Sequence, residues 1–171
     1  GLNLKNNVVY FGTIIGIDSV GNEISANAPS ITIDLVPPTV GTVADGSGND
    51  LDWLNDSADV EVNWNGFYDL NGIGNYDVAL GTTPGGTTIK DWEESGPDSS
   101  HTFTGLSLSS NVNYYFSVRA YDQLGNVSEA VSSDGFKVDI VGPEIASSSV
   151  PEGTPLTIFD ALEIDYALTE P

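Results

Sequence analysis

Two stretches of the sequence repeat a set of residues that could either bind a metal ion or turn the chain. "IIGIDSVGN" (14–22) and "VRAYDQLGN" (118–126) each end an apolar run with Asp, then Gly three residues later and Asn four residues later. Carboxylate and amide oxygens are ligands for calcium. The same residues also build turns, because Asp accepts hydrogen bonds from downstream backbone amides and Gly adopts positive φ. The sequence favours the turn first, and calcium if other loops converge on Asp122.

Two further acidic loops could supply such ligands. "YDLNGIGNYD" (68–77) is expected at the same end of the fold as the loop after residue 121, which predicts a joint calcium site from Asp69, Asn71 and Asp122. "ADGSGNDLD" (44–52) is a second possible calcium loop, with Asp45, Asn49 and Asp52 as its ligands. If the loops do not converge, these residues are turns and solvated surface.

The residue types needed for catalysis are sparse. The one histidine, His101, alternates with Phe103 on an expected strand, and the sequence contains no nucleophile-elbow motif for a Ser-His-Asp site. "DWEES" (91–95) offers adjacent carboxylates beside Trp92, which are more typical of solvated surface than of a glycosidase pair. "GTTPGG" lacks the Lys and following helix of a phosphate loop. The sequence therefore predicts a protein that is not an enzyme.

Charge excludes several partners. Four Lys or Arg stand against 25 Asp or Glu, and the net charge of −21 repels nucleic acids and anionic lipid surfaces. No apolar run reaches the 18 or so residues of a membrane span, so membrane insertion of this segment is not expected. The chain has no cysteine, which excludes disulfides and cysteine zinc sites. An acidic surface of this kind suits solubility in salt or the binding of cations.

The two similar stretches belong to a long internal repeat. Residues 1–26 align without gaps to residues 105–130, and ten of the 26 positions are identical. After one inserted residue the match continues, with "DLVPP" (34–38) against "DIVGP" (139–143). A weaker match relates "VEVNW" (60–64) to "LEIDY" (162–166). A period near 104 residues is the size of a domain, which predicts tandem globular modules.

The repeat defines three parts of the chain. Residues 37–142 are expected to form one complete module. Residues 1–36 would be the C-terminal strands (F and G) of a preceding module, and residues 143–171 the N-terminal strands (A and B) of a following one. Within the complete module, "ADVEVNW", "NYDVALG" and "YYFSVRAYD" alternate apolar and polar residues, which indicates half-buried strands. Gly, Pro, Asn and Asp clusters separate them, so the sequence predicts an all-β antiparallel sandwich.

The strand sequences also resemble a known family. "VEVNWNGF", "GNYDVALGTTPGG", "HTFTGLSL" and "VNYYFSVRAYDQLGN" resemble strands B, C, E and F of a fibronectin type III domain, an immunoglobulin-like sandwich, in the variant found in long bacterial surface proteins. The resemblance implies that Trp64, Tyr76, Leu106 and Tyr114 lie in the core. It also implies that the Tyr114 hydroxyl bonds back to upstream backbone. The chain contains no RGD tripeptide, so integrin-type adhesion is not expected.

The resemblance implies a role without catalysis. We expect a structural or adhesive repeat of a long extracellular or cell-surface protein, such as a gliding or biofilm adhesin of Bacteroidota, that acts as a spacer or stalk and is stiffened by calcium. Its expected partners are neighbouring repeats in the same chain and surface glycans or other cells. The alternative is an accessory module of a secreted enzyme, which binds carbohydrate or spaces the catalytic domain. An exposed row of aromatic residues would favour that alternative, and Trp53, Tyr68 and Trp92 are the candidates.

Overall fold

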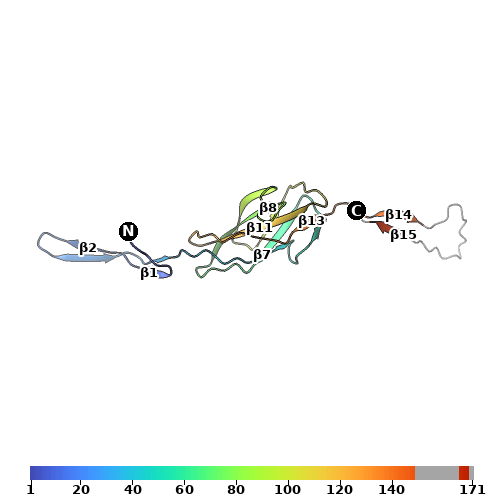
Figure 1. Ribbon diagram of the computed structural model, residues 1–171. Coiled ribbons are helices and arrows are strands. Elements are labelled where there is room, and N and C mark those ends of the chain that lie inside the picture. The colour runs from blue at the N-terminus through green and yellow to red at the C-terminus, as the bar shows by residue number, and fades with distance from the viewer. Residues whose placement is uncertain (149–165, 170–171) are drawn as a thin grey trace, which may run out of the picture.

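The computed structural model describes residues 1–148 and 166–169, and these residues form strands and no helix (Figure 1). The expected strands of a following module fall largely on residues outside this part of the chain. The strands are β1 (Val8–Tyr10), β2 (Thr13–Ile17), β3 (Glu23–Asn27), β4 (Ile31–Ile33), β5 (Thr42–Asp45), β6 (Trp53–Leu54), β7 (Val60–Asn65), β8 (Ile73–Gly81), β9 (Lys90–Gly96), β10 (Ser100–Phe103), β11 (Asn113–Asp122), β12 (Val131–Ser132), β13 (Phe136–Val138), β14 (Glu144–Ser148) and β15 (Tyr166–Thr169).

Strands β5 to β13 form a sandwich of two sheets. One sheet has the order β10-β7-β5, and the other has the order β6-β13-β11-β8-β9, with β12 paired to β11. The strand pairs are antiparallel except for β6 and β13, which run parallel. The first strand of the sandwich is thus split: β5 pairs with β7 in one sheet, and β6 pairs with β13 in the other. The all-β sandwich predicted from the alternating sequence is confirmed.

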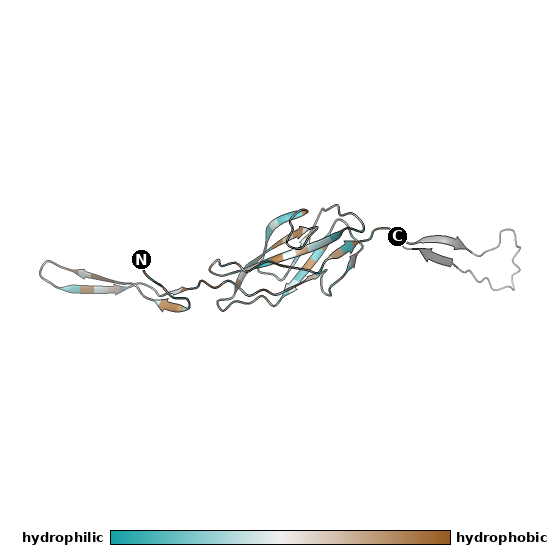
Figure 2. Ribbon diagram, viewed as in Figure 1, coloured by the Kyte–Doolittle hydropathy of each residue, from teal (hydrophilic) through white to brown (hydrophobic). Residues whose placement is uncertain are grey.

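The core lies between these two sheets and follows the period of two in the sequence. Along β7, Val60, Val62 and Trp64 are buried while Glu61 and Asn65 are exposed. Figure 2 shows this alternation of hydrophobic and hydrophilic residues along the strands. The four core residues that the resemblance implied, Trp64, Tyr76, Leu106 and Tyr114, are all buried in one cluster, together with Phe116 and Val118 of β11. Successive side chains of a strand point to opposite faces, so the pattern fixes which residues enter the core.

Aromatic rings fill the centre of the core. Phe116 stacks between Phe103 and Phe136, with ring centroids 5.9 and 5.0 Å away, and Trp64 meets Tyr76 edge to face at 5.1 Å. The Tyr114 hydroxyl accepts a hydrogen bond of 2.8 Å from the Ser109 amide, as the family resemblance implies for a corner tyrosine. The ring of Tyr114 is buried, so this bond anchors the segment before β11 to the core.

The first four strands lie outside the sandwich and form two separate pairs, β1 with β4 and β2 with β3 (Figure 1). Their apolar side chains are exposed. Ile14 is 74% exposed, whereas Val118, its counterpart in the repeat, is fully buried. Leu2 and Leu106 differ in the same way, at 88% and 9%. The apolar side chains of the repeat are therefore covered by a second sheet in the sandwich, whereas their counterparts in residues 1–33 are exposed.

Replacing Phe116 with Ala should destabilise the sandwich by about 3–5 kcal/mol, because the buried ring leaves a cavity between Phe103 and Phe136. The matched change is Phe11→Ala, at a ring that is 70% exposed, and it should alter the unfolding free energy by less than about 0.5 kcal/mol. Urea unfolding followed by tryptophan fluorescence measures both. Equal effects of the two changes would contradict this account of the core.

Candidate metal sites

The turn after β11 is held by its aspartate. One carboxylate oxygen of Asp122, Oδ1, accepts hydrogen bonds from the amides of Leu124 (2.7 Å) and Asn126 (2.9 Å). Its Oδ2 accepts one from the Asn126 side chain (2.6 Å). Gly125 supplies the positive φ of the turn, at 91°. Burial raises the pKa of Asp122, but the bonds from Asn126 and from the Leu124 and Gly125 amides outweigh it and lower the pKa below 3.8.

The first copy of this sequence builds the same turn without the burial. Asp18 Oδ1 accepts from the Val20 and Asn22 amides (2.9 and 2.8 Å), and its Oδ2 accepts from the Asn22 side chain (2.6 Å). Gly21 again has φ of 91°, and the bond from the Asn22 side chain is the main cause of a lowered pKa of Asp18. Asp18 is exposed, whereas Asp122 is 3% exposed. The turn therefore depends on local sequence, as predicted, and forms without a neighbouring loop.

Around Asp122 the structure gathers two further carboxylates. One carboxylate oxygen each from Asp34, Asp69 and Asp122 lies within 4.8 Å of the others, and we call these three residues the junction group. Each side chain is nine-tenths or more buried. Asp69 follows β7, Asp122 ends β11, and Asp34 follows β4 outside the sandwich. The group therefore joins residues 1–36 to one end of the sandwich.

Polar contacts hold the three carboxylates in place. The Asn71 amide donates to Asp69 Oδ1 (2.7 Å), and the Asn71 side chain donates to Asp34 Oδ2. The Asn126 side chain contacts the backbone oxygen of Asp34 at 3.3 Å. The predicted residues Asp69, Asn71 and Asp122 are thus brought together. A hollow of about 170 Å³, which Asp34 and Asp69 help to line, adjoins the group and is open to solvent.

Among the residues that the structure describes, no cationic side chain pairs with the junction group. The ion pairs of the described chain are Arg119 with Asp77 (2.7 Å) and His101 with Glu93 (2.8 Å). Three carboxylates that lie this close repel one another in a partly buried site. A calcium ion takes six to eight oxygen ligands, and these carboxylates are suitable donors; the Asn71 side chain presents its nitrogen to Asp34 and would have to turn to offer its oxygen. The chemistry of this donor set fits calcium better than zinc, because histidine and cysteine are lacking.

A second acidic group lies at an edge of the sandwich. One carboxylate oxygen each from Asp45, Asp50 and Asp134 lies within 4.8 Å of the others, and we call these residues the edge group. Asp45 was a predicted ligand, but its carboxylate neighbours are Asp50 and Asp134 rather than Asp52. The backbone oxygen of Asp52 accepts a bond from the Lys137 amide, which belongs to the pairing of β6 with β13. The predicted partner Asn49 is exposed in the same loop.

Two acidic residues of these groups, Asp34 and Asp134, could not be predicted as ligands from the sequence of their own loops. Asp34 is far from Asp69 and Asp122 in sequence, and Asp134 is far from Asp45. For Asp34 a signal exists in the repeat, because "DLVPP" and "DIVGP" retain the Asp as Asp34 and Asp139. In both copies this Asp accepts a bond from the amide two residues later, Val36 (3.0 Å) or Val141 (2.9 Å). Asp134 has no comparable signal, because its place depends on how two sheets meet.

The residues that the sequence offered for catalysis or carbohydrate binding, His101, Trp92 and Trp53, are engaged in packing contacts. His101 bonds to Glu93 and meets the edge of Phe103, with ring centroids 4.7 Å apart. Arg119 lies 4.5 Å over the ring of Trp92, and Lys137 lies 5.3 Å over that of Trp53. Both rings are therefore covered on one face by a cation. Tyr68 is 62% exposed and takes part in neither of these two contacts between a cation and a ring.

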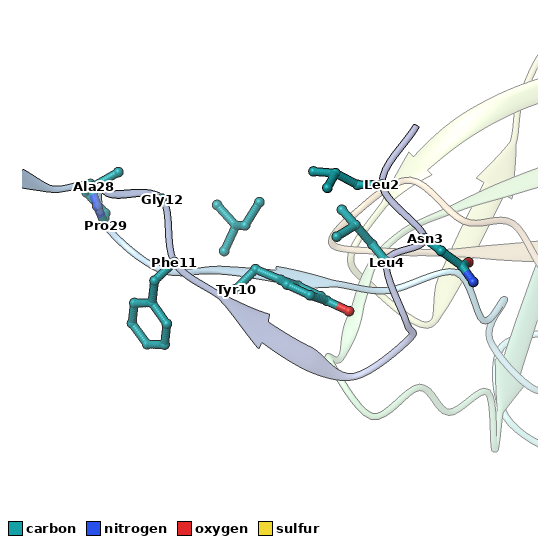
Figure 3. Close-up of a pocket in the computed structure, with 9 residues that line it drawn as sticks. Leu2, Asn3, Leu4, Tyr10, Phe11, Gly12, Ala28 and Pro29 are labelled. Carbon is teal, nitrogen blue, oxygen red and sulfur yellow. The ribbon is translucent and has the colours of Figure 1, made fainter. Parts of the chain in front are cut away.

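An apolar hollow lies in the first part of the chain. Figure 3 shows it between the segment before β1 and the end of that strand, and it has a volume of about 570 Å³. Its lining includes Leu2, Leu4, Tyr10, Phe11, Pro29 and Ile31. The repeat relates Leu2, Leu4 and Tyr10 to Leu106, Leu108 and Tyr114, which are buried in the core of the sandwich. The hollow thus corresponds to one half of such a core.

Comparison with known proteins supports the fold. No family model matches the chain, and no curated protein matches it. A crystal structure of domains from titin is similar at 17% identity with a TM-score of 0.50, over 80% of this chain and 43% of that one. A crystal structure of the FN1–FN3 domains of chicken CNTN1 matches at 15% identity with a TM-score of 0.42, over 79% of this chain and 45% of that one. This chain spans less than half the length of either. With the titin likeness, the model defines an immunoglobulin-like, fibronectin type III-like sandwich.

Within the described residues, no helix exists that could cross a membrane.

The two copies of the turn allow a matched test. Asp122→Ala removes three hydrogen bonds to a buried carboxylate and should destabilise the sandwich by about 2–4 kcal/mol. Asp18→Ala removes the same three bonds from an exposed turn and should leave the sandwich unchanged within about 0.5 kcal/mol. Urea unfolding in the presence of chelator is the measurement. A loss for Asp18→Ala as large as that for Asp122→Ala would contradict the proposed difference between the turns.

Proposed function

We propose that this chain is a segment of tandem sandwich modules, and that these modules act as a spacer or stalk in a long extracellular or cell-surface protein. The observation that carries the proposal is the structural repeat between residues 1–36 and the last strands of the sandwich. The two stretches agree in turn geometry, in hydrogen bonding and in strand pairing, although only one of them is covered by a second sheet. Residues 1–36 would accordingly be the last strands of a preceding module.

The agreement extends over the whole of residues 1–36. Two non-glycine residues of the described chain have positive φ, and they are repeat counterparts: Asn7 at 56° and Asn111 at 63°. The Tyr10 hydroxyl accepts a bond of 2.7 Å from the Lys5 amide, as Tyr114 does from Ser109 at 2.8 Å. Tyr10 pairs with Ile31 across β1 and β4, and the repeat relates this pair to Tyr114 and Phe136. Sequence similarity alone does not require such agreement in detail.

The junction group supports a role in fixing the angle between modules. Asp34 lies at the end of the preceding repeat, and Asn71 and Asn126 of the sandwich bond to it. We propose that calcium binds Asp34, Asp69 and Asp122, with Asn71 as a further ligand, and so stiffens the junction. The ion would relieve the repulsion among three buried carboxylates and would tie together parts of two modules. Asp139 would take the place of Asp34 at the next junction.

As a more specific part of the same proposal, we propose that the stalk takes part in adhesion. A stalk of repeated modules can present many weak contacts to surface glycans or other cells, and multivalency would make their sum strong. A gliding or biofilm adhesin of Bacteroidota is the kind of protein that the sequence resemblance favours. Antibody raised against the sandwich should then label intact cells of the source organism.

The alternative, an accessory carbohydrate-binding module of a secreted enzyme, has weaker support. Trp53 and Trp92 each have one face covered by a cationic side chain, so each ring offers at most its other face to a sugar. Polysaccharide binding that is lost in Trp92→Ala would favour this alternative over the spacer.

A chain of two joined copies of residues 38–142 tests the spacer proposal, because Gly142 then stands where Pro37 stands in the natural junction. The second copy then follows Asp139 of the first, so Asp139 takes the position of Asp34. Small-angle scattering should show an extended pair of modules, and calcium should narrow its distribution of lengths relative to chelator. Asp139→Asn in the first copy should abolish the effect of calcium, because it removes one of three carboxylates from the junction.

The matched control for this experiment is Asp98→Asn, which makes the same charge change at an exposed residue outside both acidic groups. It should leave the response to calcium intact. Two modules that fold back on each other would overturn the spacer proposal. A scattering curve that is identical in calcium and in chelator would overturn stiffening by calcium.

A further inference from the structure

The edge group lies where the first strand of the sandwich changes sheets. Asp45 is the last residue of β5, which pairs with β7, and the chain then loops to β6, which pairs with β13. Asp134 lies in the break between β12 and β13. The carboxylate of Asp45 bridges these segments, since its Oδ2 accepts a hydrogen bond of 3.1 Å from the Gly135 amide. The site thus joins the first strand of the sandwich to the last.

The Asp45 carboxylate is unusual because it is buried without a full set of hydrogen bonds. Its side chain is 0% exposed, and its other oxygen, Oδ1, has no hydrogen-bond partner among the described residues. Burying an unpaired polar atom costs free energy, and burying a charge costs more. Buried carboxylate oxygens are normally satisfied by hydrogen bonds or by a cation. The unpaired oxygen of Asp45 can therefore accept a further ligand.

The surroundings of Asp45 favour a cation over another donor. The carboxylates of Asp50 and Asp134 each have an oxygen within 4.8 Å of an oxygen of Asp45, so the nearest charged neighbours of Asp45 repel it. Neither ion pair of the described chain involves these acids. The amide of Asp45 donates to Asp50 Oδ1 at 2.8 Å, which holds the loop carboxylate beside Asp45. A hard divalent cation can contact all three carboxylates and offset two of their three negative charges, whereas one proton neutralises one.

The loop between β5 and β6 is held in a form that can support an ion. The Asn63 side chain donates to the backbone oxygen of Gly46 at 2.8 Å, and the Leu51 amide donates to that of Asp45 at 3.0 Å. An acidic hollow of about 380 Å³ lies against the same loop, and its lining includes Gly46, Asp56, Asp59 and Glu61. Its negative charge would raise the local concentration of cations near the edge group.

We propose that Asp45, Asp50 and Asp134 bind one calcium ion, which fastens strand β5 and the following loop to the segment between β12 and β13. Three carboxylates with no nitrogen or sulfur donor are typical of a site for a hard cation. Calcium is favoured over magnesium because it accepts irregular oxygen geometry, whereas magnesium requires near-octahedral ligands. The bound ion would secure the parallel pairing of β6 with β13, which follows directly on both sides of the site. This site is separate from the junction group and does not depend on it.

The test uses the full 171-residue chain and calcium chloride against chelator, with thermal unfolding and amide NMR as readouts. We expect affinity on the order of 10⁻⁴–10⁻³ M, as in extracellular calcium modules. Calcium should raise the thermal midpoint by several degrees through preferential binding to the folded state. It should also shift the amide resonances of Asp45, Asp50 and Gly135. Magnesium at the same concentration should have a smaller effect on both.

Matched variants separate the two acidic groups. In the Asp34→Asn/Asp69→Asn variant the junction group is disabled, and calcium should still shift the Gly135 amide. Asp134→Asn changes an exposed ligand and should abolish that shift, and Asp50→Asn should do the same. Asp98→Asn is the control with the same charge change and should respond as the unaltered chain does. Asp45→Asn is a weaker test, because Asp45 also supports the Gly135 amide in the fold.

Each result has a distinct meaning. An unchanged Gly135 resonance at millimolar calcium in the unaltered chain would overturn the edge site, and so would a shift that survives in both Asp134→Asn and Asp50→Asn. A response lost only in Asp34→Asn/Asp69→Asn would also overturn it and would leave the junction proposal standing. A Gly135 shift lost only in Asp134→Asn and Asp50→Asn would confirm the edge site, and calcium binding at the junction is tested separately by the scattering experiment.

Discussion

The scarcity of positive charge is the constraint on which the polar structure of this protein depends. With 25 Asp or Glu and four Lys or Arg, most carboxylates must be stabilised by something other than a salt bridge. One arginine is committed to Asp77 and the face of Trp92, and Lys137 covers Trp53. Carboxylates on the surface are stabilised by water. Those that the fold buries require backbone amides, side-chain amides or an external cation.

Backbone amides meet this need for Asp122 but not for Asp45. Asp122 accepts three hydrogen bonds within its own turn, and its pKa is lowered in spite of burial. Asp45 accepts one from Gly135, one of its oxygens lacks a partner in the described chain, and its pKa is raised. Burial raises the pKa of both carboxyl groups: at Asp122 the hydrogen bonds outweigh it, whereas at Asp45 burial and the charges of Asp50 and Asp134 outweigh the bonds from Ser133 and Gly135. A residue of the first kind is stable by itself, whereas one of the second kind requires a proton or a cation.

The sandwich and its core could be predicted because the information is local. Alternation along "VEVNW" and "YYFSVRAYD" shows which face of each strand is apolar, and the turn residues separate the strands. The meeting of Asp69 with Asp122 could be predicted as well, because both follow strands that end on one side of the sandwich. Asp134 could not be predicted. It joins Asp45 because the first strand changes sheets and the last strand breaks beside it, and these features depend on how the sheets pack.

Comparison of the two copies of the repeat distinguishes the structural features that the local sequence determines from those that require a complete module. Asp18 and Asp122 form turns with the same hydrogen bonds and the same φ at the glycine, although one is exposed and the other is buried. The turn is therefore a property of the sequence "D-x-x-G-N" and needs no partner. The gathering of carboxylates occurs at Asp122, where Asp69 and the Asp34 of the preceding repeat are also present. The turn alone therefore gathers no further carboxylates, and a role of this turn in cation binding would require Asp34 and Asp69 beside the carboxylate that it holds in place.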